Sequence, residues 1–366
     1  MKKRIGISLY PNFASEKENL DYLEIAAKYG CDILFIALLG AKGTRDEIIN
    51  HYKVYTKKAK DLGFEIIADV NPQIFKKLGV NASIFNGEID LSFFEELQID
   101  VIRLDYGMSA MEEAYLTKNK FGIKICMNAG GLNDHIGNVI GAGGEKSMLL
   151  GCHNYYPHRF TGILLDIFKE ATKIWNNHNI RCQAFITSQE KDAFGPWPIT
   201  EGLPTLEMHR NLPIDVQFKH LLMMDNIDDI IIGNCFASEE ELKSLQKANT
   251  SVIEFHVDLA EGLPQSMKDR LNLKLSRRND INEYLIRSLE SRLIKANTPP
   301  FNTVDIKKGD VLIDNDLYGQ YSGEVQIALR DMPNSGKTNV VGRIKEDEII
   351  LIDYLEGGQS FTLKYE

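Results

Sequence analysis

The residues best suited to chemistry are carboxylates that end apolar runs of the chain. Asp69 ends one such run and Asp105 ends the next. If the two runs are neighbouring strands, their carboxylates face each other, and their repulsion separates the two pKa values into one acid and one base. Glycoside hydrolysis needs that division of roles. Glu207 is a third candidate acid, although each carboxylate could instead only pair with Arg103 or Arg210.

Amide, aromatic and histidine side chains follow the same apolar runs. Such a set is typical of a carbohydrate site, because amides bind hydroxyl groups and tyrosine rings pack on sugar faces. We therefore predict that substrate is bound by Tyr10, Asn71, Arg103, Asn128, His153, Asn154, Tyr155, His209, Arg210 and Asn234. A lone histidine such as His153 could instead be a hydrogen-bonded residue of the core that does not contact substrate.

Arg159 lies in the motif YYPHRFTG and is followed, after Phe160, by Thr161 and Gly162. A guanidinium beside the free backbone N–H groups of a helix start forms an anion site. The motif therefore predicts that Arg159 binds a phosphate group, and the alternative is an arginine that bridges loops at the rim of the site.

Metal and cofactor chemistry has less support. The first apolar run carries no H-x-H pair, and the histidines lack H-E-x-x-H or other ligand spacing. Two glycine-rich stretches, 141–147 and 334–339, fail the spacing of a phosphate-binding loop. We predict a site without a metal or a cofactor.

The elements that must position these residues are apolar, β-branched runs separated by helical stretches. This alternation is typical of a parallel sheet buried on both faces, and eight such units favour a (β/α)8 TIM-type barrel. In that fold, the functional residues lie at the C-terminal ends of the strands. The runs occupy 3–10, 32–39, 64–71, 101–107, 123–129, 149–157, 180–188 and 229–235.

Helix starts are indicated by the pattern S/T-x-x-E, in which hydroxyl and carboxylate satisfy exposed N–H groups. It occurs at Ser15/Glu18, Thr44/Glu47, Ser92/Glu95, Ser109/Glu112 and Ser238/Glu241.

From about residue 250 the pattern changes to strands joined by short links. We predict a barrel domain over 1–249 and a smaller, mostly antiparallel β domain over 250–366. The predicted strands are 251–259, 271–276, 310–315, 325–330, 338–344 and 348–355, with one helix over 279–295. The second domain would either cap the barrel mouth or build a homodimer.

Charge and composition exclude several classes of protein. A net charge of −10 argues against a nucleic-acid partner. No apolar run approaches the roughly 20 residues that cross a bilayer, so no membrane partner is expected. The five cysteines form no C-x-x-C pair and lie in or beside predicted strands, which indicates a reducing cytoplasm.

Several motifs resemble a bacterial family of 6-phospho-N-acetylmuramidases, formerly a domain of unknown function with members labelled outer surface protein. The resemblance covers the whole chain. It rests on ISLYP, RLDYG (103–107), CHNYYP (152–157), TG (161–162), GLPTLEMHR (202–210) and GEVQIALRDMP…NVVGRI (323–344). The resemblance implies a TIM-type barrel followed by a cyclophilin-like β domain.

The resemblance also implies hydrolysis of a phosphorylated amino-sugar disaccharide, 6-phospho-N-acetylmuramic acid linked to N-acetylglucosamine, in cytoplasmic peptidoglycan recycling. The matching site positions are Asp105, His153, Asn154, Tyr155, Glu207, His209 and Arg210. Two positions depart from the family pattern. Asn234 stands where an aspartate closes the eighth strand, which weakens any carboxylate role there. His158 precedes Arg159 where the family has arginine, which leaves the position of the phosphate arginine open.

Two other functions remain open from the sequence. One is a sugar-phosphate isomerase or epimerase with a divalent metal on Asp69, Asp105 and His153. The other is a non-catalytic sugar-phosphate-binding protein. In the hydrolase, the substrate's own 2-acetamido group could serve as the nucleophile.

Overall fold

The structure is a computed structural model that describes every residue except 1, 39, 84–86, 295 and 366. The chain divides into two units, one over Lys3–Lys247 and the other consisting mainly of the chain from Ala248 onward.

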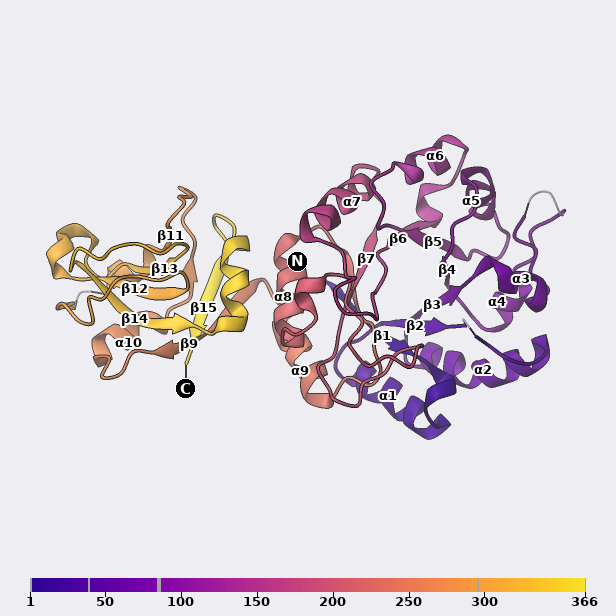
Figure 1. The fold of residues 1–366 in the computed structure, drawn as a ribbon, viewed down its shortest axis with the longest axis horizontal. Coiled ribbons are helices and arrows are strands. Elements are labelled where there is room, and N and C mark those ends of the chain that lie inside the picture. Colours follow the sequence, from indigo (N-terminus) through magenta and orange to yellow (C-terminus); the bar gives the residue numbers. More distant parts are fainter. Residues whose placement is uncertain (1, 39, 84–86, 295, 366) are drawn as a thin grey trace. The chain divides into compact units, whose positions relative to one another are not determined.

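The first unit is a closed barrel of eight parallel strands in sequence order, as predicted (Figure 1). Each predicted run contains one strand. They are β1 (Arg4–Leu9), β2 (Ile33–Ala37), β3 (Glu65–Val70), β4 (Val101–Leu104), β5 (Lys124–Asn128), β6 (Leu149–Cys152), β7 (Cys182–Ile186) and β8 (Asp229–Ile232).

The barrel closes because β1 pairs with both β2 and β8. Ile7 lies opposite Leu34 on one side and Ile232 on the other. Buried side chains from β2 to β8, among them Phe35 and Phe185, form one cluster. The strands are therefore covered on both faces, and the polar residues are left to the strand ends.

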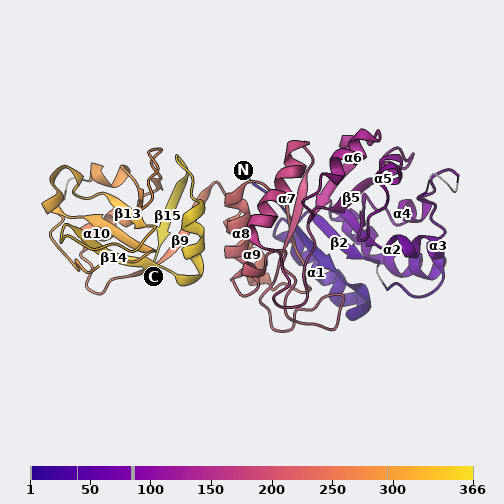
Figure 2. The same ribbon diagram turned by 45° about the horizontal axis from the view of Figure 1, so that its top comes forward.

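Helices lie outside the ring of strands (Figure 2). They are α1 (Glu16–Lys28), α2 (Arg45–Asp61), α3 (Pro72–Leu78), α4 (Ser92–Glu96), α5 (Ala110–Leu116), α6 (His135–Gly141), α7 (Leu165–Asn177), α8 (Ile214–Met224) and α9 (Glu239–Ala248). Short 3₁₀ helices are η1 (Pro11–Phe13), η3 (Lys146–Met148) and η4 (Glu207–His209). No described helix combines the length and apolar composition that crossing a membrane requires.

The helix-start patterns are confirmed in four of five places. Ser15, Thr44 and Ser109 form capping boxes with their glutamates, and the Ser238 hydroxyl accepts from the N–H of Glu241. The prediction for Ser92 is wrong, because Ser92 is already the first residue of α4. Instead, the side chain of Asp90 accepts the N–H of Ser92 at 2.9 Å.

The second unit is a seven-stranded, mostly antiparallel sheet of order β10-β15-β9-β14-β12-β13-β11. Only β15 and β9 pair in parallel. The strands are β9 (Val252–Leu259), β10 (Leu275–Ser276), β11 (Leu285–Arg287), β12 (Asp310–Asp314), β13 (Val325–Ala328), β14 (Thr338–Ile344) and β15 (Ser360–Lys364). The helices are α10 (Gln265–Leu271), η5 (Glu290–Leu293), η6 (Asp316–Tyr321) and η7 (Glu346–Tyr354).

Two predicted elements of this unit are wrong. The segment 279–295 is not a helix: its described residues contain β11 and η5, since the Asn282 side chain accepts the N–H groups of Tyr284 and Leu285 and turns the chain. Residues 348–354 of the predicted strand 348–355 lie in the 3₁₀ helix η7 instead. Its apolar run buries Leu351, Ile352 and Leu355, and periodicity cannot separate a strand from a buried helical turn in so short a run.

Candidate active site

Two neighbouring strands position the central charged residues. Asp69 in β3 lies directly opposite Arg103 in β4. Asp105 follows β4 two residues beyond Arg103, and alternation along the strand directs both side chains to the same side. These residues lie toward the C-terminal ends of their strands, where TIM-type barrels carry their active sites.

Arg103 joins both carboxylates and Asn154 in one hydrogen-bonded group, here named the Arg103 cluster. Its Nη1 donates to Asp69 Oδ1 at 2.7 Å and to Asp105 Oδ1 at 2.9 Å, and its Nη2 donates to Asn154 Oδ1. Burial alone would lower the pKa of Arg103, but Asp69 and Asp105 outweigh it and raise this pKa, so the guanidinium stays charged. The strand ends therefore converge on one rim.

The two carboxylates differ in accessibility. The side chain of Asp69 is 1% exposed and that of Asp105 is 31% exposed. Burial raises the pKa of Asp69, against the opposing effect of Arg103, and Oδ2 of Asp69 has no hydrogen-bond partner among the described residues. Asp105 is thus the more accessible carboxylate of the pair, and Arg103 links it to the buried Asp69.

Two tyrosines support the cluster from the barrel core. The ring of Tyr155 packs edge-on against Phe35 and Phe185. Burial, together with the charge of Asp69, raises the pKa of Tyr155, so its hydroxyl stays protonated. Tyr10 is 2% exposed and donates to the carbonyl of Gly233 at 2.5 Å, so it is a buried support rather than an open sugar platform.

A cavity of about 340 Å³ adjoins the cluster through Asn154. Amides and aromatic rings dominate its lining, as a sugar ring with an acetamido group requires. The lining residues are Asn128, Gly130, Gly131, Asn133, His135, Ile136, Asn154, Tyr156 and Trp175. Of the predicted binding residues, Asn128 and Asn154 belong to this set.

The residues after β5 that line this cavity were missed from the sequence. Asn133 and His135 come from the segment GGLNDH, and its position directly after a barrel strand was the signal that could have identified them. His135 Nε2 lies 2.5 Å from the carboxylate of Glu113, a fully buried side chain of α5. Burial raises the pKa of Glu113, and its contact with His135 opposes this effect.

Glu207 braces the loops that follow β6 and β7. Its carboxylate accepts from Arg210 Nε and Nη2, each at 2.7 Å, and from the backbone N–H groups of Phe160 and Gly162, each at 2.8 Å. Gly162 is needed there, because a Cβ would lie 2.6 Å from the backbone nitrogen of Glu207. The Arg210 hydrogen bonds lead the effects that lower the pKa of Glu207 to about 2. Glu207 is therefore ionised at neutral pH, and this geometry does not support the predicted role as an acid.

The contacts of Glu207 also bear on the anion site that the sequence predicted at Arg159. The backbone N–H groups of Phe160 and Gly162, which we predicted would bind a phosphate, donate to Glu207 instead. The helix start that was expected near Gly162 is not there, because α7 begins at Leu165. Arg210 is also engaged, since it donates to backbone carbonyls of both loops and is 4% exposed. Arg159 itself is 57% exposed and pairs with Glu201 at 3.5 Å, so it is an accessible cation of the loop after β6.

Three predicted binding residues are directed away from the Arg103 cluster. His153 is fully buried, lies 2.9 Å from the hydroxyl of Thr172 in α7, and burial lowers its pKa to about 3. His209 is fully buried against His220, with 2.7 Å between Nε2 and Nδ1. Asn234 binds the backbone of Ser188. We leave these three out of the proposed site.

The metal alternative required Asp69, Asp105 and His153 to converge, and they do not. His153 contacts Phe168 and Thr172 of α7, whereas both aspartates contact Arg103. No group of three or more metal-binding side chains occurs among the described residues. Asn71 directly follows β3, two residues after Asp69, and its binding role stays a prediction.

Comparison with known families decides the assignment. The N-terminal family of 6-phospho-N-acetylmuramidases matches residues 5–247, and the C-terminal family matches residues 253–364. This chain belongs to the 6-phospho-N-acetylmuramidase family. The resemblance noted in the sequence is thereby confirmed over both units.

Two solved structures resemble this member of the family over their full length. An uncharacterized B. cereus protein shares 38% identity with a TM-score of 0.89, and the match covers 100% of each chain. A conserved Enterococcus faecalis protein of unknown function shares 25% identity with a TM-score of 0.76, over 99% of this chain and 96% of that one. No curated protein matches the chain.

The brace formed by Glu207 predicts an acid-sensitive contribution to stability. Because its pKa is lowered to about 2 from an ordinary 4.5, the contribution is complete above pH 4.5 and is lost as the pH falls toward 2. We expect Glu207→Gln to lower the free energy of unfolding by about 1–3 kcal/mol at pH 7. Thermal unfolding of the wild type and of Glu207→Gln at pH 7, 5 and 3 measures this contribution. A difference in stability between the two proteins that grows toward pH 3 would contradict the prediction.

Proposed function

We propose that this chain hydrolyses the glycosidic bond between 6-phospho-N-acetylmuramic acid and N-acetylglucosamine. The observation that carries the proposal is the Arg103 cluster, a charged group with one accessible carboxylate at the C-terminal rim of a TIM-type barrel. The family assignment supports the substrate. Five buried free cysteines fit a reducing compartment, and we place the reaction in cytoplasmic peptidoglycan recycling.

In this proposal, Asp105 is the general acid and, in the second step, the general base. It donates a proton to the glycosidic oxygen as the bond from that oxygen to the anomeric carbon breaks. The acetamido oxygen of the same sugar attacks the anomeric carbon, as in substrate-assisted families. A water molecule then opens the cyclic intermediate and gives a proton to Asp105. Asn154 and the neighbouring cavity of amides hold the acetamido group.

The Arg103 cluster favours this scheme over direct attack by water with two opposed carboxylates. Oδ1 of Asp69 and Oδ1 of Asp105 both bind one nitrogen, at 2.7 and 2.9 Å. They therefore lie closer together than the roughly 6.5–9.5 Å that inverting enzymes keep between their carboxyl groups. Arg103, fixed between them, holds Asp105 in one orientation and needs no metal to do so.

Arg159 is the proposed phosphate contact, because it is an accessible cation in the loop after β6, whereas Arg210 is engaged by Glu207 and backbone carbonyls. We expect Arg159→Ala to raise KM for the phosphorylated disaccharide about tenfold, since an exposed charge-assisted hydrogen bond is lost, and to change kcat little. Initial rates with the phosphorylated and unphosphorylated disaccharides test this. A drop in kcat with unchanged KM would contradict the assignment.

The proposed function is tested by incubating the chain with the phosphorylated disaccharide and its unphosphorylated twin, with and without EDTA. Mass spectrometry should show N-acetylglucosamine released from the phosphorylated disaccharide alone, at the same rate with the chelator. Equal cleavage of both substrates would show that the enzyme does not recognise the phosphate group. Loss of activity in EDTA would favour metal-dependent chemistry instead.

A further inference from the structure

The second unit contains a cavity of its own, of about 430 Å³. Its walls come from β11 to β14 and from the loops around them. The lining residues are Asp280, Asn282, Leu285, Arg287, Ile306, Leu312, Asp314, Tyr318, Tyr321, Gln326, Met332, Pro333, Asn334, Ser335 and Thr338. Because every one of them lies in the second unit, the cavity is complete without the barrel.

The cavity combines an apolar floor with an aromatic rim. Leu285 and Met332 pack against a buried cluster that includes Ile306 and Leu312. Tyr318 and Tyr321 are 40% and 38% exposed, and their rings meet at 89° with centroids 6.3 Å apart. Such exposed rings above an apolar floor are typical of sites that enclose a small organic ligand.

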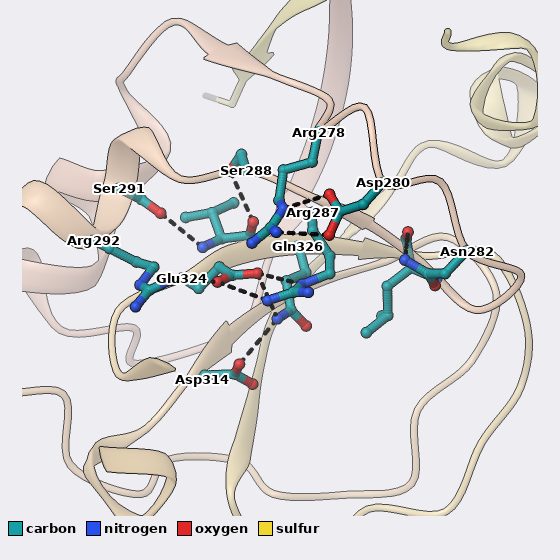
Figure 3. Close-up of polar contacts among 12 residues, drawn as sticks. Arg278, Asp280, Asn282, Arg287, Ser288, Ser291, Arg292, Asp314, Glu324 and Gln326 are labelled. Atoms are coloured by element: carbon teal, nitrogen blue, oxygen red, sulfur yellow. Dashed lines mark hydrogen bonds and ion pairs between the residues drawn. The ribbon is translucent and has the colours of Figure 1, made fainter. Parts of the chain in front are cut away.

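A buried carboxylate positions the polar groups of this cavity. Glu324 is fully buried and accepts from Arg287 Nε at 2.6 Å and from Arg287 Nη2 at 3.2 Å. Gln326 Nε2 donates to Asp314 Oδ2 at 2.9 Å and to Glu324 Oε1 at 3.4 Å. Figure 3 shows Arg287, Gln326 and Glu324 directed toward one another, with Asp314 beyond Gln326.

These contacts leave one donor of Arg287 and one acceptor of Gln326 available to a ligand. Within the described part of the chain, no hydrogen bond engages Arg287 Nη1 or Gln326 Oε1. Because both N–H groups of the Gln326 amide face carboxylates, its oxygen is held on the opposite side. Arg287 and Gln326 are also direct partners across β11 and β13, so the donor and the acceptor lie side by side.

The charges around the cavity favour a neutral ligand. The guanidinium of Arg287 is balanced by Glu324, and Asp280 pairs with Arg278 at 2.6 Å. Asp314 accepts from Thr338 Oγ1 at 2.9 Å as well as from Gln326, and burial raises its pKa to about 6. An anion would face this carboxylate, and a free cation would face Arg287.

We propose that this cavity binds a neutral small molecule through an amide group. The ligand's carbonyl oxygen accepts from Arg287 Nη1 and its N–H donates to Gln326 Oε1, while its apolar part contacts Leu285, Leu312 and Met332. Both an N-acetylated sugar and an acylated amino acid carry this chemistry. The site is separate from the Arg103 cluster, and the proposal does not depend on the activity of the barrel.

Methyl NMR of the full chain, labelled at isoleucine and methionine, tests the proposal directly, since Ile306 and Met332 line the cavity. The probes are N-acetylglucosamine and N-acetylalanine methylamide, with glucose as the probe without an amide. We expect saturable shifts of both methyl signals, in the millimolar range typical of such small ligands, with one or both amide probes and none with glucose. Shifts with only one amide probe identify the source of the ligand.

Two substitutions and one control complete the test. Gln326→Met removes the acceptor, and Tyr318→Ala removes a ring from the exposed rim, where folding is least at risk. Each should weaken binding about fivefold or more. Tyr115→Ala changes an equally exposed tyrosine, 38%, on α5 of the barrel and should leave binding unchanged. Absence of shifts with both amide probes, equal shifts with glucose, or unchanged affinity in Tyr318→Ala would overturn the proposal.

Discussion

Asp105→Asn should lower kcat/KM for the phosphorylated disaccharide about a thousandfold or more, with little change in the melting temperature. The substitution keeps the shape of the side chain and its contact with Arg103 but removes the group that carries the proton to the glycosidic oxygen. General acid–base catalysis contributes about 10²–10⁴ in rate, which sets the expected size. Asp69 still pairs with Arg103 at 2.7 Å, so the buried guanidinium keeps a counter-charge in this variant.

A matched control for Asp105 exists at the other end of the barrel. Asp32 precedes β2, is 49% exposed and pairs with Arg4 at 3.5 Å. Asp32→Asn removes a similar arginine-bound carboxylate at a distance from the proposed site and should leave kcat/KM unchanged. If Asp105→Asn kept full activity, Asp105 would not be the catalytic acid. If it bound substrate normally and the wild type showed no turnover, the chain would be a binding protein.

Asp69→Asn should instead combine a large loss of stability with a loss of activity. Asp69 is 1% exposed and holds Arg103 at 2.7 Å, and removing one partner of a buried ion pair typically costs about 3–5 kcal/mol. Activity falls because Arg103 no longer fixes Asp105. Chemical unfolding together with kcat measured below the transition separates the two effects.

Asp229 offers the control for Asp69. It is also 1% exposed and accepts from Arg181 Nη2 at 2.5 Å and from Gln183 Nε2 at 2.8 Å, but it lies at the start of β8, the opposite end of the barrel. Asp229→Asn should destabilise the chain to a similar extent while kcat stays at the wild-type value. Equal losses of kcat in both variants would mean that Asp69 has only a structural role.

The barrel was predictable because each strand is a short, continuous apolar run. Burial on both faces demands such runs, and β2 and β7 are buried along their whole length. The convergence of Asp69, Arg103 and Asp105 then followed from parallel strands whose ends share one rim. The second unit was less predictable, since the apolar run 348–355 suits a strand and a 3₁₀ helix equally, and tertiary packing decided between them.

The contacts of residues in loops could not be predicted from the sequence. Glu207 and Arg210 have the chemistry of a catalytic pair, but the backbone of two loops folds onto them and uses both side chains as a brace. His153 lies one residue beyond β6, where the side of the sheet that it faces depends on local packing against α7. Sequence position alone cannot supply that direction.

If the Arg103 cluster acts on the glycosidic bond, a crystal structure of the Asp105→Asn chain with the intact phosphorylated disaccharide should show the bond beside it. We expect the glycosidic oxygen at about 2.6–3.2 Å from the substituted side chain at position 105, with the acetamido group in the cavity beside Asn154. Disaccharide bound with its glycosidic oxygen remote from position 105 would contradict it.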